Sequence, residues 1–147
     1  MQRFRGDDSL RAIEFVLYNE REIRLAVFEA RNNSVCHTGG SPSGHAYIAD
    51  PTAIQAVRNA EELPSVTLSD GKTLSLPEKW LSVIDKLREW ASLDTIAHGI
   101  LHDRYHEEPW QYSTNRLNIS HTTYTNYLDR IRTQAKIIAA KFDLIEI

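Results

Sequence analysis

A long stretch near the N-terminus, from Ser9 to about Asn32, contains neither proline nor glycine, and this constrains the fold more than any other feature. Apolar positions recur through the stretch at spacings of three and four, the period of one face of an α-helix. Because a capping acid or serine precedes this pattern and asparagines follow it, the sequence predicts one long amphipathic helix. Its predicted buried face includes Ile13, Val16, Ile23, Val27 and Ala30.

The size and composition of the chain favour a small globular protein. A length of 147 residues, of which 41% are hydrophobic, can fill one core or two small lobes. The single cysteine, Cys36, excludes an internal disulfide and a multi-cysteine zinc site. No apolar run approaches the roughly 20 residues of a membrane span, and the first residues lack the apolar segment of a signal peptide. We therefore expect a cytoplasmic protein with no membrane partner.

The middle of the chain has the signals of a loop, a short helix and a β-hairpin. Residues 33–50 are predicted to form a loop, because they are rich in glycine and serine and lack helical periodicity. Asp50 then precedes Pro51, as a capping acid precedes a first-turn proline, and this predicts a short helix to about Glu62. Residues 66–76 alternate apolar and polar residues around Asp70-Gly71, which predicts a small hairpin.

Two further helices are predicted between the hairpin and residue 109. The first begins at Pro77 and ends near Ser92. The second follows Asp94, a capping acid, and ends before Pro109. Each presents one apolar stripe to the core. The stripes consist of Trp80, Val83, Ile84, Leu87 and Trp90 in the first helix and of Ile96, Ala97, Ile100, Leu101 and Tyr105 in the second.

The segment after Pro109 has the layout of a helix-turn-helix. A short helix beginning at Pro109 is predicted to bury Trp110 and Leu117, so that all three tryptophans of the chain lie in the core. Asn118 can adopt the left-handed conformation of a tight turn. Ile119 would then fill the corner between this helix and the next.

The second helix of this unit carries the candidate DNA-contacting residues. Ser120 would cap its start, and Tyr124, Leu128 and Ile131 would face the core at spacings of four and three. Short polar side chains at the start of such a helix read base edges in the major groove, and Asn126 could pair with adenine. Basic side chains would neutralise phosphates and fix the register. The predicted contacts to double-stranded DNA are Arg116, Ser120, His121, Thr122, Thr123, Thr125, Asn126, Arg130, Arg132 and Lys136.

Local charge favours this interpretation, although the whole chain is slightly acidic. The formal net charge of −3 argues against attraction of the whole molecule to nucleic acid. Residues 113–141, however, contain five basic residues and one acidic residue, a local net charge of +4. The basic charge is therefore concentrated in the segment with the helix-turn-helix pattern.

These elements together predict a mainly α fold. We expect a helical bundle with a long N-terminal helix, one small β-hairpin and a C-terminal helix-turn-helix. Residues 1–92 form the predicted helical N-terminal region, with the loop at 33–50 and the hairpin at 66–76, and residues 93–147 form the predicted DNA-binding region. In a simpler alternative, residues 113–141 are only a capped pair of helices that packs on the rest of the domain.

The turn Leu117-Asn118-Ile119-Ser120, with Tyr105 ending an earlier helix, carries a resemblance to known DNA-binding families. Residues 80–144 resemble region four of bacterial sigma factors. The element order of the whole chain, with Ala49-Asp50-Pro51-Thr52 after the glycine- and serine-rich loop, is similar to phage and prophage transcriptional regulators of the RinA and ArpU type. The resemblance implies a phage-encoded activator of late or packaging genes. It places Ser120, His121, Thr122, Thr123 and Asn126 on the recognition helix.

Two DNA-dependent functions fit this pattern. The first is a sequence-specific transcriptional regulator, for which RNA polymerase is a further candidate partner. The second is a small terminase-like subunit that recognises DNA during phage packaging. In either case, the long first helix could pair with that of another copy, giving a homodimer or a higher oligomer that reads two half-sites.

A helical interaction module or a metal-binding protein is the alternative of another class. His98 and His102 lie four residues apart, as in helical zinc sites, and His106 continues the spacing. However, no glutamate follows His98 as the zincin motif requires. Cys36 and His37 are adjacent, and no third group completes a catalytic set. We therefore expect no enzyme, no bound metal and no cofactor.

Overall fold

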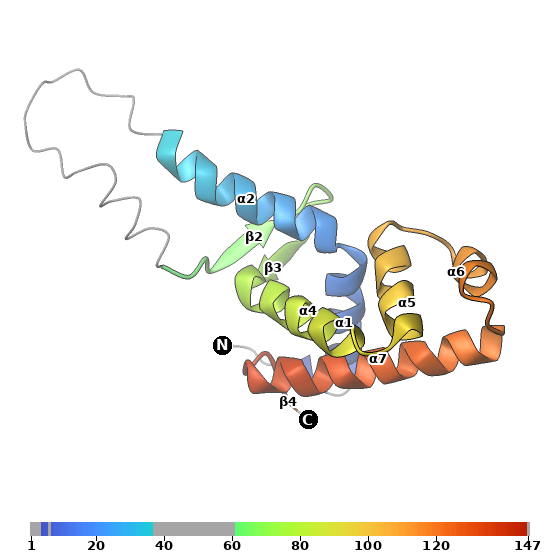
Figure 1. Ribbon diagram of the computed structural model, residues 1–147. Coiled ribbons are helices and arrows are strands. Elements are labelled where there is room, and N and C mark those ends of the chain that lie inside the picture. The colour runs from blue at the N-terminus through green and yellow to red at the C-terminus, as the bar shows by residue number, and fades with distance from the viewer. Residues whose placement is uncertain (1–3, 6, 37–60, 147) are drawn as a thin grey trace, which may run out of the picture. The chain divides into compact units, whose positions relative to one another are not determined.

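A computed structural model describes residues 4–5, 7–36 and 61–146 of the chain (Figure 1). Over these residues the protein is mainly helical, with six helices and one small antiparallel hairpin, which confirms the predicted mainly α class. In these same ranges, no helix combines the length and the apolar character needed to cross a membrane. The predicted helix from Pro51 to Glu62 and most of the predicted loop at 33–50 lie outside the described residues.

The chain divides into two compact units. The first comprises residues 1–21 and 79–147, and the second comprises residues 22–78. The sequence predicted a boundary between residues 92 and 93, where a DNA-binding region would begin. That boundary stays a prediction.

The first unit is a bundle of helices. It contains α1 (Asp7–Tyr18), most of α4 (Pro77–Ala91), α5 (Thr95–Tyr105), α6 (Trp110–Leu117) and α7 (His121–Lys141). Helix α7 packs against α1, α5 and α6, and α5 also packs against α1 and α6. The most deeply buried apolar side chains of this unit are Ile13, Val16, Trp80, Val83, Ile84, Leu87, Ala91, Ala97, Ile100, Ile131, Ala135, Ala139 and Ile145.

The two ends of the first unit's chain meet in a short parallel pair of strands that the sequence pattern did not predict. Strand β1 (Phe4–Arg5) aligns Phe4 with Ile145 of β4 (Ile145–Glu146). Each strand has two residues, too few to show the alternation by which strands are recognised in a sequence. β1 contacts α1 and β4 contacts α7, so the pair closes the bundle beside these two helices.

The prediction of one long N-terminal helix is wrong, because the chain forms two helices separated at Asn19. Helix α1 ends at Tyr18, and α2 (Glu20–Cys36) begins after the single residue Asn19. The Asn19 side chain donates a hydrogen bond to the Phe15 carbonyl at 2.9 Å. Asparagine side chains compete in this way for backbone groups and weaken helix continuity. Because the break involves only Asn19, the apolar spacing continues across it, and the break is not visible in the sequence pattern.

The second unit contains the main part of α2 and the predicted hairpin. Strands β2 (Ser65–Thr67) and β3 (Thr73–Ser75) pair antiparallel with Val66 opposite Leu74, which confirms the hairpin around Asp70-Gly71. Gly71 has φ +85°, a left-handed conformation that glycine adopts without steric cost. The Ser69 hydroxyl donates to the Glu22 carboxylate at 3.1 Å, so the turn is tied to α2.

Helices α5, α6 and α7 all end in the same way. A residue with positive φ follows each helix, namely Glu107, Asn118 and Asp143. The next amide then donates to a carbonyl five residues earlier, at 2.9 to 3.0 Å in all three cases. This Schellman-type ending satisfies backbone carbonyls that the helix leaves open.

Candidate nucleic-acid interface

Helices α6 and α7 are joined by a turn of three residues. Asn118 has φ 53° and ψ 51°, the left-handed conformation that the sequence predicted for it. The Ile119 amide donates to the Thr114 carbonyl at 3.0 Å and ends α6. The Ser120 hydroxyl then accepts a hydrogen bond from the Thr123 amide at 3.1 Å, which confirms Ser120 as the N-cap of α7. The chain is therefore redirected within three residues and a second helix begins at once.

The start of α7 is exposed on one side and buried on the other. Tyr124 and Ile131 are buried as predicted, whereas Leu128 is only half-buried. Burial raises the pKa of the Tyr124 phenol above its ordinary value. Thr123 is half-buried. Most of the predicted contact residues on this helix and its cap are exposed: Ser120, His121, Thr122, Thr125, Asn126 and Arg130.

Trp110 does not lie in the core, contrary to the prediction. Its side chain is 42% exposed. The indole lies against His121, with ring centroids 4.3 Å apart. The first turn of α6 thus contacts the exposed start of α7, and the buried position one turn later is a serine, Ser113. Of the other two tryptophans, Trp80 is buried as expected and Trp90 is half-buried.

Further polar residues that the sequence pattern did not single out extend this surface along α6. Gln111, Tyr112 and Asn115 are exposed, and Tyr112 is 46% exposed. Gln111 and Asn115 are four residues apart and so share one face of the helix. That spacing was the available signal, but α6 is too short for such a pattern to stand out.

Arg116, a predicted phosphate contact, instead joins α6 to α5. Its guanidinium donates to the Asp103 carboxylate at 2.9 and 3.2 Å and to the Gly99 carbonyl at 3.1 Å. The Asp103 side chain is only 3% exposed, whereas that of Arg116 is 40% exposed. A methyl group at Gly99 would lie 2.7 Å from the Leu117 side chain, so glycine permits this close approach of the two helices. Arg116 therefore compensates a buried negative charge.

Arg132, another predicted phosphate contact, is also held by carboxylates. It pairs with Glu14 of α1, and with Asp129 one turn away at 3.4 Å. Arg104 of α5 donates to the same Glu14 at 3.0 Å. Burial by itself would raise the pKa of Glu14, but the hydrogen bonds and charges of Arg132 and Arg104 outweigh it and hold the pKa below its ordinary value. This cluster ties α1, α5 and α7 together.

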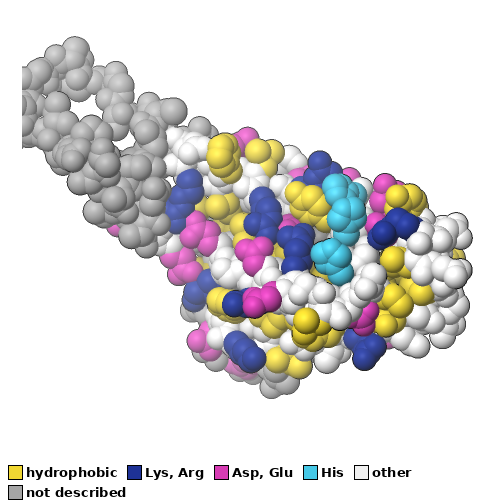
Figure 2. Space-filling view, in the orientation of Figure 1, with side chains coloured by type: hydrophobic (Ala, Val, Ile, Leu, Met, Phe, Trp, Pro, Cys, Tyr) yellow, Lys and Arg dark blue, Asp and Glu magenta, His cyan; other side chains and the backbone are white. Residues whose placement is uncertain are grey.

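The surface formed by α6 and the first two turns of α7 is almost free of charge. We call this surface the polar face; it comprises residues 110–126. Arg116 is the only charged residue in that range, and it is paired with Asp103. In the space-filling view, the end of the molecule over α6 and the start of α7 is mostly white with some apolar side chains (Figure 2). Amides, hydroxyls and aromatic rings therefore dominate the polar face.

Besides Arg132, the predicted basic residues that follow the polar face are Arg130 and Lys136. Arg130 is exposed, and its guanidinium lies 5.3 Å from the ring centre of Tyr127. Lys136 is half-buried, and Lys141 near the end of α7 is exposed. The local charge of +4 that the sequence suggested is thus reduced at the surface, because Arg116 and Arg132 have carboxylate partners from α5 and α1.

The histidines of α5 lie on its exposed side. His98, His102 and His106 are all exposed, and the rings of His102 and His106 are 4.6 Å apart. His102 also lies 3.5 Å from the Asp103 carboxylate. Within the described ranges, no three side chains of histidine, cysteine, aspartate or glutamate are grouped so that they could hold a metal ion. His37, which follows Cys36 in the sequence, lies outside the described residues.

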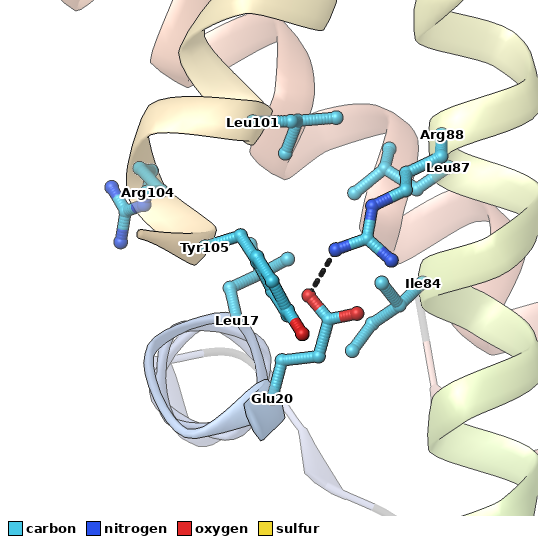
Figure 3. A pocket seen from close by; sticks show the side chains of 8 residues that line it. All are labelled: Leu17, Glu20, Ile84, Leu87, Arg88, Leu101, Arg104 and Tyr105. Carbon is cyan, nitrogen blue, oxygen red and sulfur yellow. Dashed lines mark hydrogen bonds and ion pairs between the residues drawn. The ribbon is translucent and has the colours of Figure 1, made fainter. Parts of the chain in front are cut away.

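A small pocket lies where α1, α4 and α5 meet the first residue of α2 (Figure 3). Glu20 points into it and forms an ion pair with Arg88. The Tyr105 ring stands beside this pair, with the Arg88 guanidinium 5.2 Å from its centre. The pocket has room for only about one water molecule. It therefore does not provide a site for a small-molecule substrate.

Comparison of this chain with protein-family models, with curated proteins and with solved structures finds no match. The resemblance to sigma region four and to phage regulators therefore stays a prediction from the sequence motifs.

Proposed function

We propose that the protein is a sequence-specific DNA-binding transcriptional regulator, with α6, the turn at residues 118–120 and α7 acting as a helix-turn-helix. The phage or prophage character follows only from the sequence resemblance and is part of the proposal. The observation that carries it is the start of α7. There His121, Thr122, Thr125 and Asn126 are exposed while Tyr124 is buried.

The chemistry of these exposed groups supports contact with bases. The amide of Asn126 can both donate to and accept from adenine in the major groove. Threonine contributes a hydroxyl for hydrogen bonds and a methyl group for the methyl of thymine. Helix α7 begins with amides whose partial positive charge favours a nearby phosphate. The polar face thus offers base contacts, with few of the permanent charges that drive non-specific binding.

The ion pairs divide the predicted contacts into two groups. Arg130 and Lys136 are the proposed phosphate contacts, since they follow the polar face on α7. Arg116 and Arg132 are proposed to position the helices instead, because each is held by a carboxylate of another helix. A regulator built in this way should bind weakly to random DNA, and it should depend on base contacts for its affinity.

Selection of bound sequences from a pool of random duplex DNA tests the proposal. The wild-type protein should enrich one motif. Asn126→Ala and Thr122→Ala should each lower affinity for that motif roughly tenfold and relax the preference at different base pairs. Thr133→Ala is the matched control, because Thr133 is exposed on the same helix about two turns beyond Asn126. It should retain both motif and affinity.

Circular dichroism of each variant distinguishes lost contacts from lost folding. A folded wild-type protein that enriches no motif, and gives no shifted complex at low salt, would overturn the proposal. So would a motif that is unchanged in both Asn126→Ala and Thr122→Ala, because the polar face would then not read the bases.

A further inference from the structure

Helix α2 of the second unit has a second apolar stripe, on the side opposite its buried one. Ile23 is fully buried, whereas Leu25 is 57% and Phe28 is 64% exposed. At about 100° per residue, Leu25 and Phe28 lie within about 60° of each other and roughly opposite Ile23. Asn32, also exposed, continues the stripe. The spacing of three and then four residues is that of the a, d and a positions of a heptad.

Charges of opposite sign flank this stripe. Glu22 and Glu29 lie along one side, both exposed, and Arg24 and Arg31 lie along the other, both half-buried. Arg31 is hydrogen-bonded to Glu78 of the same unit at 2.7 Å. In heptad terms, the glutamates occupy e positions and the arginines occupy g positions. Arg24 also has an interaction within the chain. The two flanks of the stripe thus carry charges of opposite sign.

We propose that α2 pairs in parallel with α2 of a second copy of this chain. In a parallel pair, each g residue meets the e residue five positions later on the other helix, so Arg24 meets the partner's Glu29 on both sides of the interface. An antiparallel pair would place e beside e and g beside g, and like charges would then face each other. Leu25, Phe28 and Asn32 meet their own counterparts, and an asparagine at an a position favours two-stranded, in-register pairing.

The size of the stripe sets the expected strength of the dimer. Two apolar layers and one polar layer fall far below the roughly 1,200 Å² of a standard stable interface. The dimer should therefore be reversible and visible only at high protein concentration. The proposed dimer uses only residues of the second unit, so the proposal does not depend on whether the first unit binds DNA.

Sedimentation equilibrium of the full chain, without DNA and up to several hundred micromolar protein, tests the pairing. The wild-type protein should show a monomer–dimer equilibrium. Leu25→Glu and Phe28→Glu should each raise the dissociation constant by about tenfold or more. Leu93→Glu is the matched control, since Leu93 is 91% exposed on the other unit, and it should leave the dimer unchanged.

A pair of charge reversals tests the orientation. In Arg24→Glu alone, and in Glu29→Arg alone, both intermolecular pairs become repulsive and the dimer should be lost. Mixed together, the two variants should form a heterodimer, because both pairs are again of opposite sign. A wild-type monomer at every concentration, a dimer indifferent to Leu25→Glu and Phe28→Glu, or a mixture no more dimeric than its components would overturn the proposal.

Cross-linking gives an independent measure of register. In a Cys36→Ser background, Asn32→Cys should form an intermolecular disulfide readily, because residue 32 meets its own counterpart in the parallel pair. Thr133→Cys in the same background reports random collision, since Thr133 is exposed on the other unit. Equal rates of cross-linking at the two positions would contradict the parallel register.

Discussion

The middle of α7 and its first two turns are built from different chemistry. In the middle, Arg132 joins Glu14 and Arg104 in a cluster of charges between three helices. At the start, residues 121–126 have no Lys, Arg, Asp or Glu and expose hydroxyls, an amide and an imidazole. Ion pairs therefore link the middle of α7 to α1 and α5. Uncharged polar groups form the exposed surface at the start of α7.

This difference shows why a count of basic residues overstates the charge available to a ligand. Arg116 and Arg132 raise the local charge of the sequence, but their partners Asp103 and Glu14 come from outside the counted segment. Without its arginine, a buried carboxylate would carry an uncompensated desolvation penalty. Such arginines are held by carboxylates of the fold, and they add less to the surface charge than their number suggests.

Replacement of the buried carboxylate should produce the largest effect. Asp103→Ala removes the acceptor of two Arg116 hydrogen bonds at the contact of α5 and α6. Loss of one partner of a buried pair costs about 3–5 kcal/mol, and the partial exposure of Arg116 reduces this to about 2–3 kcal/mol. Urea unfolding measures the loss. Asp129→Ala, at an exposed pair, should cost under about 0.5 kcal/mol. Equal losses would contradict the distinction between buried and exposed pairs.

The cap of α7 should contribute less. Ser120→Ala removes the hydroxyl that accepts from the Thr123 amide and should lower the free energy of unfolding by about 1 kcal/mol. Ser120→Asp should retain stability, because aspartate caps as well as serine does. Thr125→Ala, at an exposed position of the same helix, is the control and should cost under about 0.5 kcal/mol. A Ser120→Ala protein as stable as the control would mean that the cap adds nothing in solution.

The sequence predicted the helical class, the hairpin and most helix ends because each has a local physical cause. Asp94 accepts from the Ile96 amide at 2.9 Å, Pro77 opens α4, and Asn118 takes the left-handed conformation, all as their residue types require. The break at Asn19 could not be predicted in the same way. An asparagine inside a helical pattern only weakens the helix. Whether the helix actually breaks there depends on tertiary packing, which the periodicity of the sequence does not show.

Prediction of the site was limited by contacts between distant residues. The outward-facing positions at the start of α7 follow from the helical period alone, so most were correctly predicted to be exposed. The partners of Arg116 and Arg132 lie 13 and 118 residues away, and nothing local indicates them. Trp110 was expected in the core because tryptophan is usually buried, but its neighbour across the turn is the exposed His121.

The charged cluster should make stability depend on pH in the acidic range. The pKa of Glu14 is lower in the folded protein than its ordinary value of 4.5, so its contribution is present in full above that value. It is then lost as the pH falls through the folded pKa, where Glu14 takes up a proton. Since Glu14 is about a third exposed, solvent screening limits the effect to under about 1 kcal/mol. Glu14→Gln should be less stable than wild type at neutral pH, and the difference should shrink below about pH 4. A constant difference across this range would rule out the carboxylate charge as its source.

The smallest expected effect is on the salt dependence of DNA binding. It distinguishes the exposed Arg130 from Arg132, which is paired with Glu14. Each neutralised phosphate contributes about −0.9 to the slope of log affinity against log salt concentration. Arg130→Ala should reduce the magnitude of this slope by about one, because its exposed guanidinium follows the polar face on α7. Arg132→Ala should leave the slope unchanged while lowering stability, because its charge is already balanced by Glu14. If Arg132→Ala instead reduced the slope as much as Arg130→Ala, the ion pair would have to open when DNA binds, and the division of α7 into a structural middle and an open start would fail.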